Sequence, residues 1–188
     1  RLGAADVQRD LEDADDHARF IEAVVSQPSG IVRVACLYLP NGNPVASEKY
    51  PYKLRWMDRL RSYASERLRL EEPLVLAGDY NVIPTRRDVY KPERWVDDAL
   101  FREETREAFG RLMAQGWTDA LRKLHPDETI YTFWDYFRDA YKRNAGLRID
   151  HFLMSPPALR ACTAVEIDVD ARAGEKPSDH APVVATLE

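Results

Sequence analysis

The first third of the chain alternates between short apolar runs and one long amphipathic segment. Residues 19–25 and 31–39 are rich in β-branched residues and flank a Ser-Gln-Pro-Ser-Gly turn sequence, so they predict a hairpin. Apolar residues at helical spacing predict a helix over 47–70, and we expect Lys53 and its other basic residues on a solvated face. The polar, acidic residues 1–16 show no clear period and predict a loop.

The middle of the chain adds one strand and one further helix. Residues 74–79 form a short apolar run that ends in an acid, which predicts a strand. Residues 103–115 repeat the helical pattern and are followed by Gly116, which predicts a helix with a glycine stop. Residues 83–101 between them predict a loop, and Asp119 is placed to cap a short helix.

The last third is predicted to consist mainly of strands. Residues 131–134 carry three aromatic side chains, 147–153 form an apolar run around one aspartate, and 162–169 and 182–187 are β-rich. The proline pair at 156–157 predicts a turn. Strands therefore outnumber helices, which favours a sandwich of two sheets flanked by helices.

The length and composition of the chain are those of an ordinary single-domain protein. A length of 188 residues predicts a single domain over 1–188, and 45% apolar with 31% charged residues is normal for a soluble protein. We find no segment apolar enough to cross a membrane and no signal peptide, so we expect no membrane association. Cys36 and Cys162 are the only cysteines, and we expect reduced, buried thiols in a cytoplasmic protein.

Net charge leaves the partner undecided. A value of −5 argues mildly against nucleic acid, since most nucleic-acid-binding proteins present basic patches. A metal site, however, concentrates acids that a cation neutralises. The 27 Lys and Arg residues can also gather on one face, and Arg138, Lys142 and Arg143 in the charged segment 135–145 are available to phosphates.

Polar side chains occur at three predicted strand ends. Asp79 and Asn81 follow one strand, Asp150 lies within an apolar run, and Asp179 and His180 directly precede the last strand. Taken singly, each has a structural explanation: an Asx turn, a buried acid paired with the neighbouring arginine or a histidine, and a loop cap. Together they supply the oxygen ligands, the proton-handling group and the positioning amide that a metal-assisted hydrolase needs.

These motifs, in their order and approximate spacing, resemble the exonuclease III branch of the endonuclease/exonuclease/phosphatase superfamily, which contains the abasic-site DNA endonucleases. Sphingomyelinases, inositol-phosphate phosphatases and secreted deoxyribonucleases share Gly-Asp-x-Asn and Ser-Asp-His, whereas Leu-Arg-Ile-Asp and Phe-Trp-Asp-Tyr point to the DNA-repair branch. The resemblance implies an α+β fold, a four-layer α/β-sandwich of two packed, mainly antiparallel sheets flanked by helices. The matching segments are 38–42 (Tyr-Leu-Pro-Asn-Gly), 78–81 (Gly-Asp-Tyr-Asn), 131–136 (Tyr-Thr-Phe-Trp-Asp-Tyr), 146–150 (Gly-Leu-Arg-Ile-Asp) and 176–182 (Lys-Pro-Ser-Asp-His-Ala-Pro).

The same resemblance implies three sets of site residues and a Mg²⁺ cofactor, for which Mn²⁺ would substitute. The implied catalytic residues are Tyr38, Asp79, Asn81, Asp150 and His180. The implied metal ligands are Asp79, Asn81, Asp179 and His180. The implied substrate-binding residues are Asn144, Phe133, Trp134, Leu147 and Arg148.

The implied function is that of a metal-dependent DNA phosphodiesterase of base-excision repair, an abasic-site endonuclease and 3′-5′ exonuclease. It would act as a monomer on double-stranded DNA with abasic sites or 3′ ends. The alternatives are a phosphodiesterase for RNA or another phosphate ester, and a catalytically degenerate DNA-binding member. The family's N-terminal strands, with a metal-binding glutamate, have no counterpart here, so we expect this chain alone to be poorly active. Leu147 replaces a large aromatic found in some relatives, which leaves the balance of the two activities open.

Overall fold

Six strands in the order β1-β2-β3-β4-β6-β5 form the main sheet of the computed structural model, which describes residues 4–9, 17–27 and 30–188. All neighbouring pairs are antiparallel except β3 and β4, which are parallel. The parallel pair therefore ends at one edge of the sheet, where the loops that follow both strands meet. The strands are β1 Ala4–Arg9, β2 Phe20–Gln27, β3 Gly30–Tyr38, β4 Leu74–Asp79, β5 Thr118–Asp119 and β6 Asp150–Met154.

The predicted hairpin is confirmed as β2 and β3, which pair from Phe20↔Leu37 to Gln27↔Gly30. The prediction of a loop over residues 1–16 is wrong for residues 4–9, which form β1 against β2. Pairing with a neighbouring strand supplies the backbone hydrogen bonds of β1, and the local sequence pattern does not reveal such pairing. Residues 10–16 lie outside the described residues.

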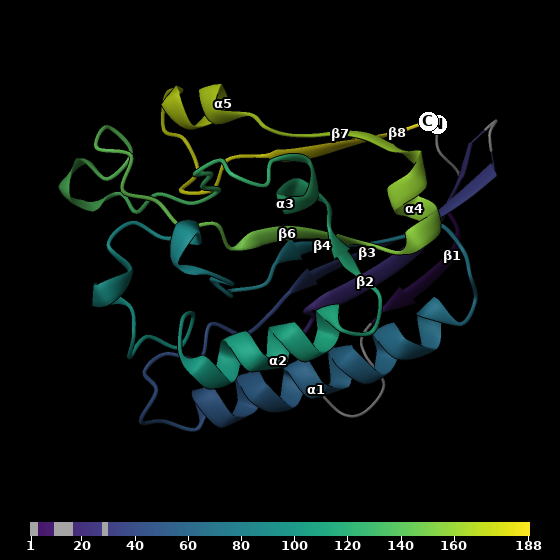
Figure 1. The fold of residues 1–188 in the computed structure, drawn as a ribbon, viewed down its shortest axis with the longest axis horizontal. Helices are drawn as coiled ribbons and strands as arrows, with labels where there is room; N and C mark the ends of the chain where they lie inside the picture. Colours follow the sequence, from purple (N-terminus) through teal and green to yellow (C-terminus); the bar gives the residue numbers. More distant parts are fainter. Residues whose placement is uncertain (1–3, 10–16, 28–29) are drawn as a thin grey trace.

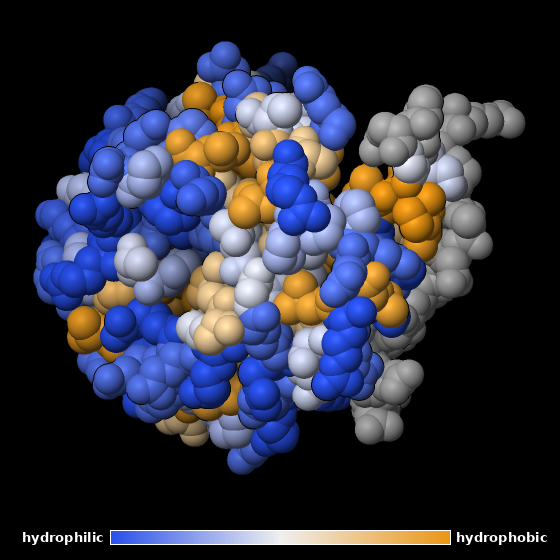
Figure 2. All heavy atoms as spheres, turned by 45° about the vertical axis from the view of Figure 1, so that its right-hand side comes forward, coloured by the Kyte–Doolittle hydropathy of each residue, from blue (hydrophilic) through white to orange (hydrophobic). Residues whose placement is uncertain are grey.

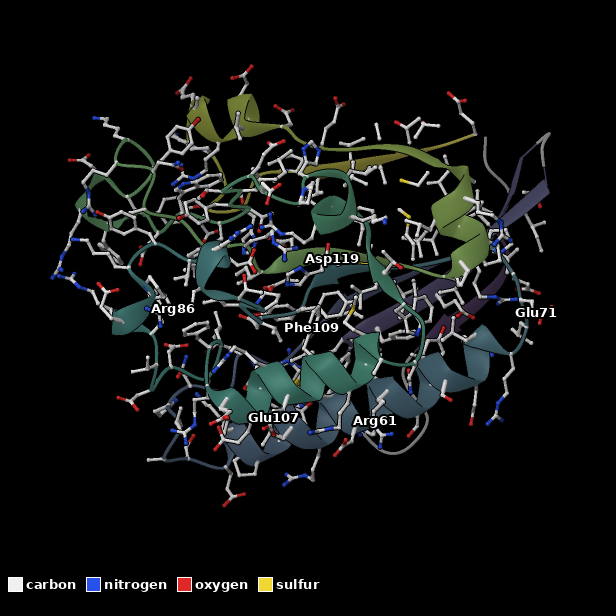
Figure 3. The ribbon with its side chains drawn as sticks, viewed as in Figure 1. Arg61, Glu71, Arg86, Glu107, Phe109 and Asp119 are labelled. Atoms are coloured by element: carbon white, nitrogen blue, oxygen red, sulfur yellow. The ribbon has the colours of Figure 1, made fainter. Side chains whose placement is uncertain are left out.

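Two long helices cover one face of this sheet (Figure 1). They are α1, Lys49–Leu68, and α2, Glu103–Met113, as the helical spacing predicts. Leu74 and Leu76 of β4 belong to the same core cluster as Trp56 of α1 and Phe109 of α2. Figure 3 shows Phe109 on the inner side of α2, where its ring packs against that of Tyr80 with centroids 5.9 Å apart.

A two-stranded sheet covers the opposite face. It consists of β7, Cys162–Ile167, and β8, Val183–Leu187. Val75 and Met154 of the main sheet join Val165 of β7 in a second core cluster. Because neighbouring residues of β4 face opposite sides, this one strand contributes to both clusters. The expected α+β sandwich is confirmed.

Short helices complete the structure, and two of the predictions fail here. The Pro156–Pro157 pair begins a helix rather than a turn, because Ser155 accepts a hydrogen bond from Ala158 N and proline fits the first helical turn. The strand predicted over residues 131–134 is absent. In this segment only Phe133 pairs with other segments, through isolated bridges to Leu147 and His180. The short elements are α3 Ala120–Leu124, α4 Pro156–Ala161, α5 Val169–Ala173 and the 3₁₀ turns Arg86–Asp88, Pro92–Arg94 and Phe137–Asp139.

The described surface is mainly hydrophilic with some exposed apolar side chains. Figure 2 shows apolar areas between polar ones on the side of the molecule that carries α4. Both cysteines are free, but Cys36 is exposed and Cys162 is half-buried, so the expectation of buried thiols is wrong. No helix among the described residues is long and apolar enough to span a membrane.

Candidate active site

Three neighbouring strands bring the predicted acids together at one end of the main sheet. Tyr38 of β3 and Asp150 of β6 are the register partners of Asp79 at the end of β4. Gly78 makes the close β3–β4 approach possible, because it has a φ of +139° and a Cβ there would lie 1.9 Å from the carbonyl oxygen of Leu37. The strand register alone therefore sets these three side chains next to one another.

Asp79 and Asn81 form a tight hydrogen-bonded unit after β4. The backbone N–H of Asn81 donates to Asp79 Oδ1 at 2.8 Å, and its side-chain Nδ2 donates to Asp79 Oδ2 at 3.1 Å. Asn81 has a positive φ of 48°, a conformation that asparagine tolerates better than most residues. The Asx-turn explanation is thus geometrically correct, and the same turn also fixes the direction of the Asn81 amide.

His180 is paired with Asp150. Its Nδ1 lies 2.9 Å from Asp150 Oδ2 and 3.2 Å from Oδ1. The hydrogen bond that His180 donates to Asp150 raises the pKa of His180, which favours the cationic imidazolium. The ring of Phe133 packs against the imidazole, with centroids 5.1 Å apart. Nδ1 is thereby occupied, and Nε2 is left for another partner.

Burial and negative charge both act on Asp79. Burial, followed by repulsion from Asp150, raises the pKa of Asp79 to about 6, against smaller opposing effects of the Asn81 N–H, His180 and Lys53. An acid with a pKa close to neutrality is suited to accepting a proton from water.

A cavity of about 310 Å³ connects these groups. Its walls combine polar side chains from the strand ends with the apolar side chains of Phe133 and Leu147. The sequence-predicted residues that line it are Tyr38, Asp79, Asn81, Phe133, Leu147, Asp179 and His180.

A second cavity of about 700 Å³ adjoins the first, and the two share Trp95, Asp98, Phe133, Asp135 and Leu147. The acids Asp98 and Asp135 line this larger cavity together with four basic side chains, whose excess of positive charge suits it to an anionic chain such as a phosphodiester backbone. The basic residues are Lys91, Arg94, Arg138 and Arg143.

Three expected substrate-binding residues do not line either cavity. Arg148 is only 1% exposed and forms ion pairs with Asp88 at 2.7 Å and Asp119 at 2.6 Å. Trp134 is 3% exposed, and its indole N–H donates to Asn144 Oδ1 at 3.1 Å. The expectation of direct substrate contact is therefore wrong for Arg148 and Trp134, and Asn144 binds the indole instead. Asn144 is exposed, and its substrate-binding role stays a prediction.

Lys53 is a residue that the sequence analysis misplaced. Instead of facing solvent, it is 0% exposed and donates from Nζ to the carbonyl oxygens of Asn81, at 2.5 Å, and Asn41, at 3.1 Å. Burial lowers its pKa to about 7 in spite of the opposing charges of Asp79 and Asp98. A signal was present in the sequence, because Lys53 falls at helical spacing on the apolar stripe with Met57.

Two asparagines near the cavity were also missed. Asn41 Nδ2 donates to Asn81 Oδ1 at 3.0 Å, and Asn43 Nδ2 contacts both oxygens of Asp98 at 3.2 Å. Asn41 lies three positions after the last residue of the Tyr38 strand, so its place near the strand end could have been foreseen. The contact between Asn43 and Asp98 joins two loops, and no local pattern indicates it.

Comparison with known proteins identifies the family to which the chain belongs. The model of the Endonuclease/Exonuclease/phosphatase family matches residues 3–180. The chain belongs to this family.

Relatives within the endonuclease/exonuclease/phosphatase family agree in sequence and fold. Exodeoxyribonuclease III from Haemophilus influenzae is 34% identical over 182 residues, which cover 93% of this chain and 68% of the relative. An AP endonuclease from Archaeoglobus fulgidus has a TM-score of 0.93 and 36% identity, covering 100% of this chain and 72% of that one. A 3′ phosphatase from Neisseria bound to a product DNA hairpin has a TM-score of 0.94 and 37% identity over the same shares. The resemblance to the exonuclease III branch is confirmed, and the chain spans 68–72% of the lengths of these proteins.

The oxygen-bearing side chains around the smaller cavity could form part of a binding site for a hard cation such as Mg²⁺. Asp79, Asn81 and Asp179 line the smaller cavity, and hard cations prefer the oxygen donors that such side chains carry. Within the described ranges, no group of three or more His, Cys, Asp and Glu side chains is arranged to hold a metal ion. The residues present therefore supply some ligands of a cation site and not a complete protein cage.

Proposed function

We propose that this chain carries the catalytic residues of a metal-dependent DNA phosphodiesterase of base-excision repair, which cuts at abasic sites and removes nucleotides from 3′ ends. It is a hydrolase of the exodeoxyribonuclease III type. One observation carries the proposal: the hydrogen-bonded Asp79–Asn81 unit and the Asp150–His180 pair meet beside one cavity. A carboxylate that accepts a proton and an imidazolium that binds a phosphate are the two functions that phosphodiester hydrolysis needs.

Each side chain then has a distinct part in the reaction. Asp79 takes the proton of the attacking water, because its carboxylate lines the cavity beside the Asp150–His180 pair. Asn81 holds the Asp79 carboxylate in place, because its backbone N–H and its side-chain Nδ2 both donate to that group. His180, held by Asp150 through Nδ1, presents Nε2 to a phosphate oxygen, and the Tyr38 hydroxyl contributes a further hydrogen bond.

Asp79, Asp179 and the Asn81 amide would hold Mg²⁺, for which Mn²⁺ substitutes. When bound, the cation supplies Lewis-acid stabilisation of the charge that develops on the phosphate. His180 is the weaker candidate ligand, although the sequence motif suggests it. A metal-bound imidazole must be neutral, and Asp150 favours the cationic form.

The wider surroundings support a DNA substrate. Phe133 and Leu147 provide an apolar wall suited to a deoxyribose without its base, and the basic side chains of the larger cavity are suited to the adjoining phosphates. The Neisseria relative bound to a product DNA hairpin supports the same substrate class. We propose a monomer, since one chain supplies all the named side chains. We also propose a cytoplasmic location, which the free thiols of Cys36 and Cys162 support.

The test is nicking of a DNA duplex that carries one abasic site, with Mg²⁺ and with EDTA. The chain and the full reading frame that encodes it are assayed side by side. We expect the full reading frame to show Mg²⁺-dependent nicking that EDTA and Asp79→Asn abolish and that the exposed control Asp170→Asn keeps. The same assay on an RNA duplex and on a phospholipid headgroup ester separates the other substrates. Duplex binding without any nicking by either form would replace this proposal with a binding-only member of the family.

A further inference from the structure

We propose that Lys53 is a positioning residue for the active site, which holds the two asparagine-bearing loops in register through their backbone carbonyls. Asn41 lies in the loop after β3, and Asn81 lies in the loop after β4. The ammonium group of Lys53 donates to the peptide carbonyls of both residues, at 3.1 Å and 2.5 Å. One side chain from α1 thus joins two loops that the chain separates by 40 positions.

The structure provides a fitted space for this side chain. Gly42, with a φ of +90°, lies against the lysine stem, and a Cβ there would come within 2.7 Å of Lys53 Cδ. The same hypothetical Cβ would meet Ala99 at 3.1 Å. The loop after β3 therefore uses glycine at the point where it passes over the lysine. Most lysines that bury their aliphatic stem keep the ammonium group in water, but Lys53 is 0% exposed and its ammonium group is buried too.

The two bonds act on side chains that line the cavity. Asn41 donates to Asn81 Oδ1 at 3.0 Å, and this bond leaves Asn81 Nδ2 directed to Asp79 Oδ2 and to the carbonyl of Leu39. If the two loops separated, the bond between the asparagines would break and the Asn81 amide could rotate. Lys53 does not line the cavity, so its influence passes through Asn41 and Asn81.

A purely structural role would not require an ammonium group. Neighbouring buried positions of α1, such as Met57 and Leu60, are filled by apolar side chains. Burying a charged amine is costly, and an apolar residue of similar length would fill the same space. The ammonium group is therefore best explained by the two carbonyls that it binds.

The experiment compares Lys53→Met, which keeps the length of the stem and removes the donor, with Met57→Ala as a control that loosens the same helix. Both proteins are labelled with ¹⁵N, and the side-chain amide signals of Asn41 and Asn81 are followed by NMR. We expect the two variants to lose a similar amount of Tm. Both asparagine amide signals should shift in Lys53→Met and should stay in place in Met57→Ala. In the nicking assay we expect a 10- to 100-fold lower kcat with a KM within about twofold for Lys53→Met, and a kcat close to wild type for Met57→Ala.

A measurement on the wild-type protein tests the proposal even if Lys53→Met does not fold. Hydrogen-bond couplings from Lys53 Nζ to the carbonyl carbons of Asn41 and Asn81 are expected in the wild-type spectrum. Their absence, or unchanged asparagine amide signals in a folded Lys53→Met protein, would overturn the positioning role. The kinetic arm rests on the proposed nuclease function, whereas the NMR arms need no substrate. A wild-type protein without nuclease activity would thus refute the function and leave the test of Lys53 intact.

Discussion

Arg148 donates from Nε to Asp88 Oδ1 across 2.7 Å, and the two side chains are 1% and 0% exposed. Arg122 donates to the same carboxylate oxygen at 2.8 Å, and Arg148 also reaches Asp119 at 2.6 Å and Nδ1 of His151 at 3.0 Å. Because arginine only donates, His151 Nδ1 accepts, and its Nε2–H donates to the carbonyl of Val82 at 2.9 Å. This buried network connects the strand of Asp150 to the loop that follows Asn81.

Substitution of Asp88 should destabilise the protein strongly. In Asp88→Asn the guanidinium of Arg148 stays buried without its full charge partner, and we expect the free energy of unfolding to fall by about 3 kcal/mol. Urea unfolding at pH 7 measures the difference. The control is Asp127→Asn, which removes an exposed ion pair with Arg87 and should leave the midpoint nearly unchanged. Equal midpoints for the two variants would show that the buried network contributes little.

The same carboxylate should produce acid sensitivity. Burial raises the pKa of Asp88, but the hydrogen bonds and charge of Arg148, with Thr85 and Arg122, outweigh burial and lower the pKa to about 2. A group whose folded pKa is lowered contributes stability above its unfolded pKa of about 4, and this contribution disappears as pH falls towards 2. We therefore expect the stability gap between wild type and Asp88→Asn to shrink by roughly 2 kcal/mol between pH 5 and pH 2. Urea unfolding at several pH values tests this, and a gap that stays constant would contradict it.

Two glycines should respond to alanine in opposite directions. A Cβ at Gly146 would lie 2.6 Å from Tyr131 Cβ and 2.8 Å from Trp134 Nε1, so Gly146→Ala should cost about 2 kcal/mol by overpacking. Gly110 lies within α2 with nothing within 4 Å of its hypothetical Cβ, so Gly110→Ala should stabilise by about 0.5–1 kcal/mol. Thermal unfolding of both variants tests the pair. A tolerated alanine at position 146 would mean that the segment over Tyr131 is less tightly packed.

The larger cavity should contribute to DNA binding through charge. We expect Arg94→Ala to weaken duplex binding and to lower the slope of log K against log salt by about 0.9, the value for one phosphate contact. Binding is measured by fluorescence anisotropy over a range of salt concentrations. The control is Arg160→Ala, because Arg160 is an exposed residue of α4 outside this cavity. If both variants lose affinity to the same extent, the effect comes from net charge and not from the cavity.

The sequence predicted the main strands and both long helices, since each has a regular period over many residues. It also predicted the meeting of Asp79, Asp150 and His180, because all three lie at strand ends in recognisable motifs. It failed for Arg148, whose partner Asp88 lies 60 positions away, because burial depends on contacts that no local pattern contains.

Other failures have the same origin. Trp134 lies beside Phe133 in one aromatic run, yet Phe133 lines the cavity and Trp134 packs behind it against Tyr131. Lys53 was assigned by its charge, although its position on the apolar stripe of α1 was visible. The strand β1 could not be foreseen because its pairing with β2 is a tertiary contact.

The parallel pairing of β3 and β4 links activity to one step of folding. Tyr38 and Asp79 become neighbours only when these two strands pair, and residues 39–73, including α1, must first close as a loop. Contacts between distant parts of a chain form more slowly than local ones, so the β2–β3 hairpin and α1 can form before the site exists. A partly folded chain with native helix content would therefore be inactive. The recovery of phosphodiester cleavage during refolding would then report when β3 and β4 pair.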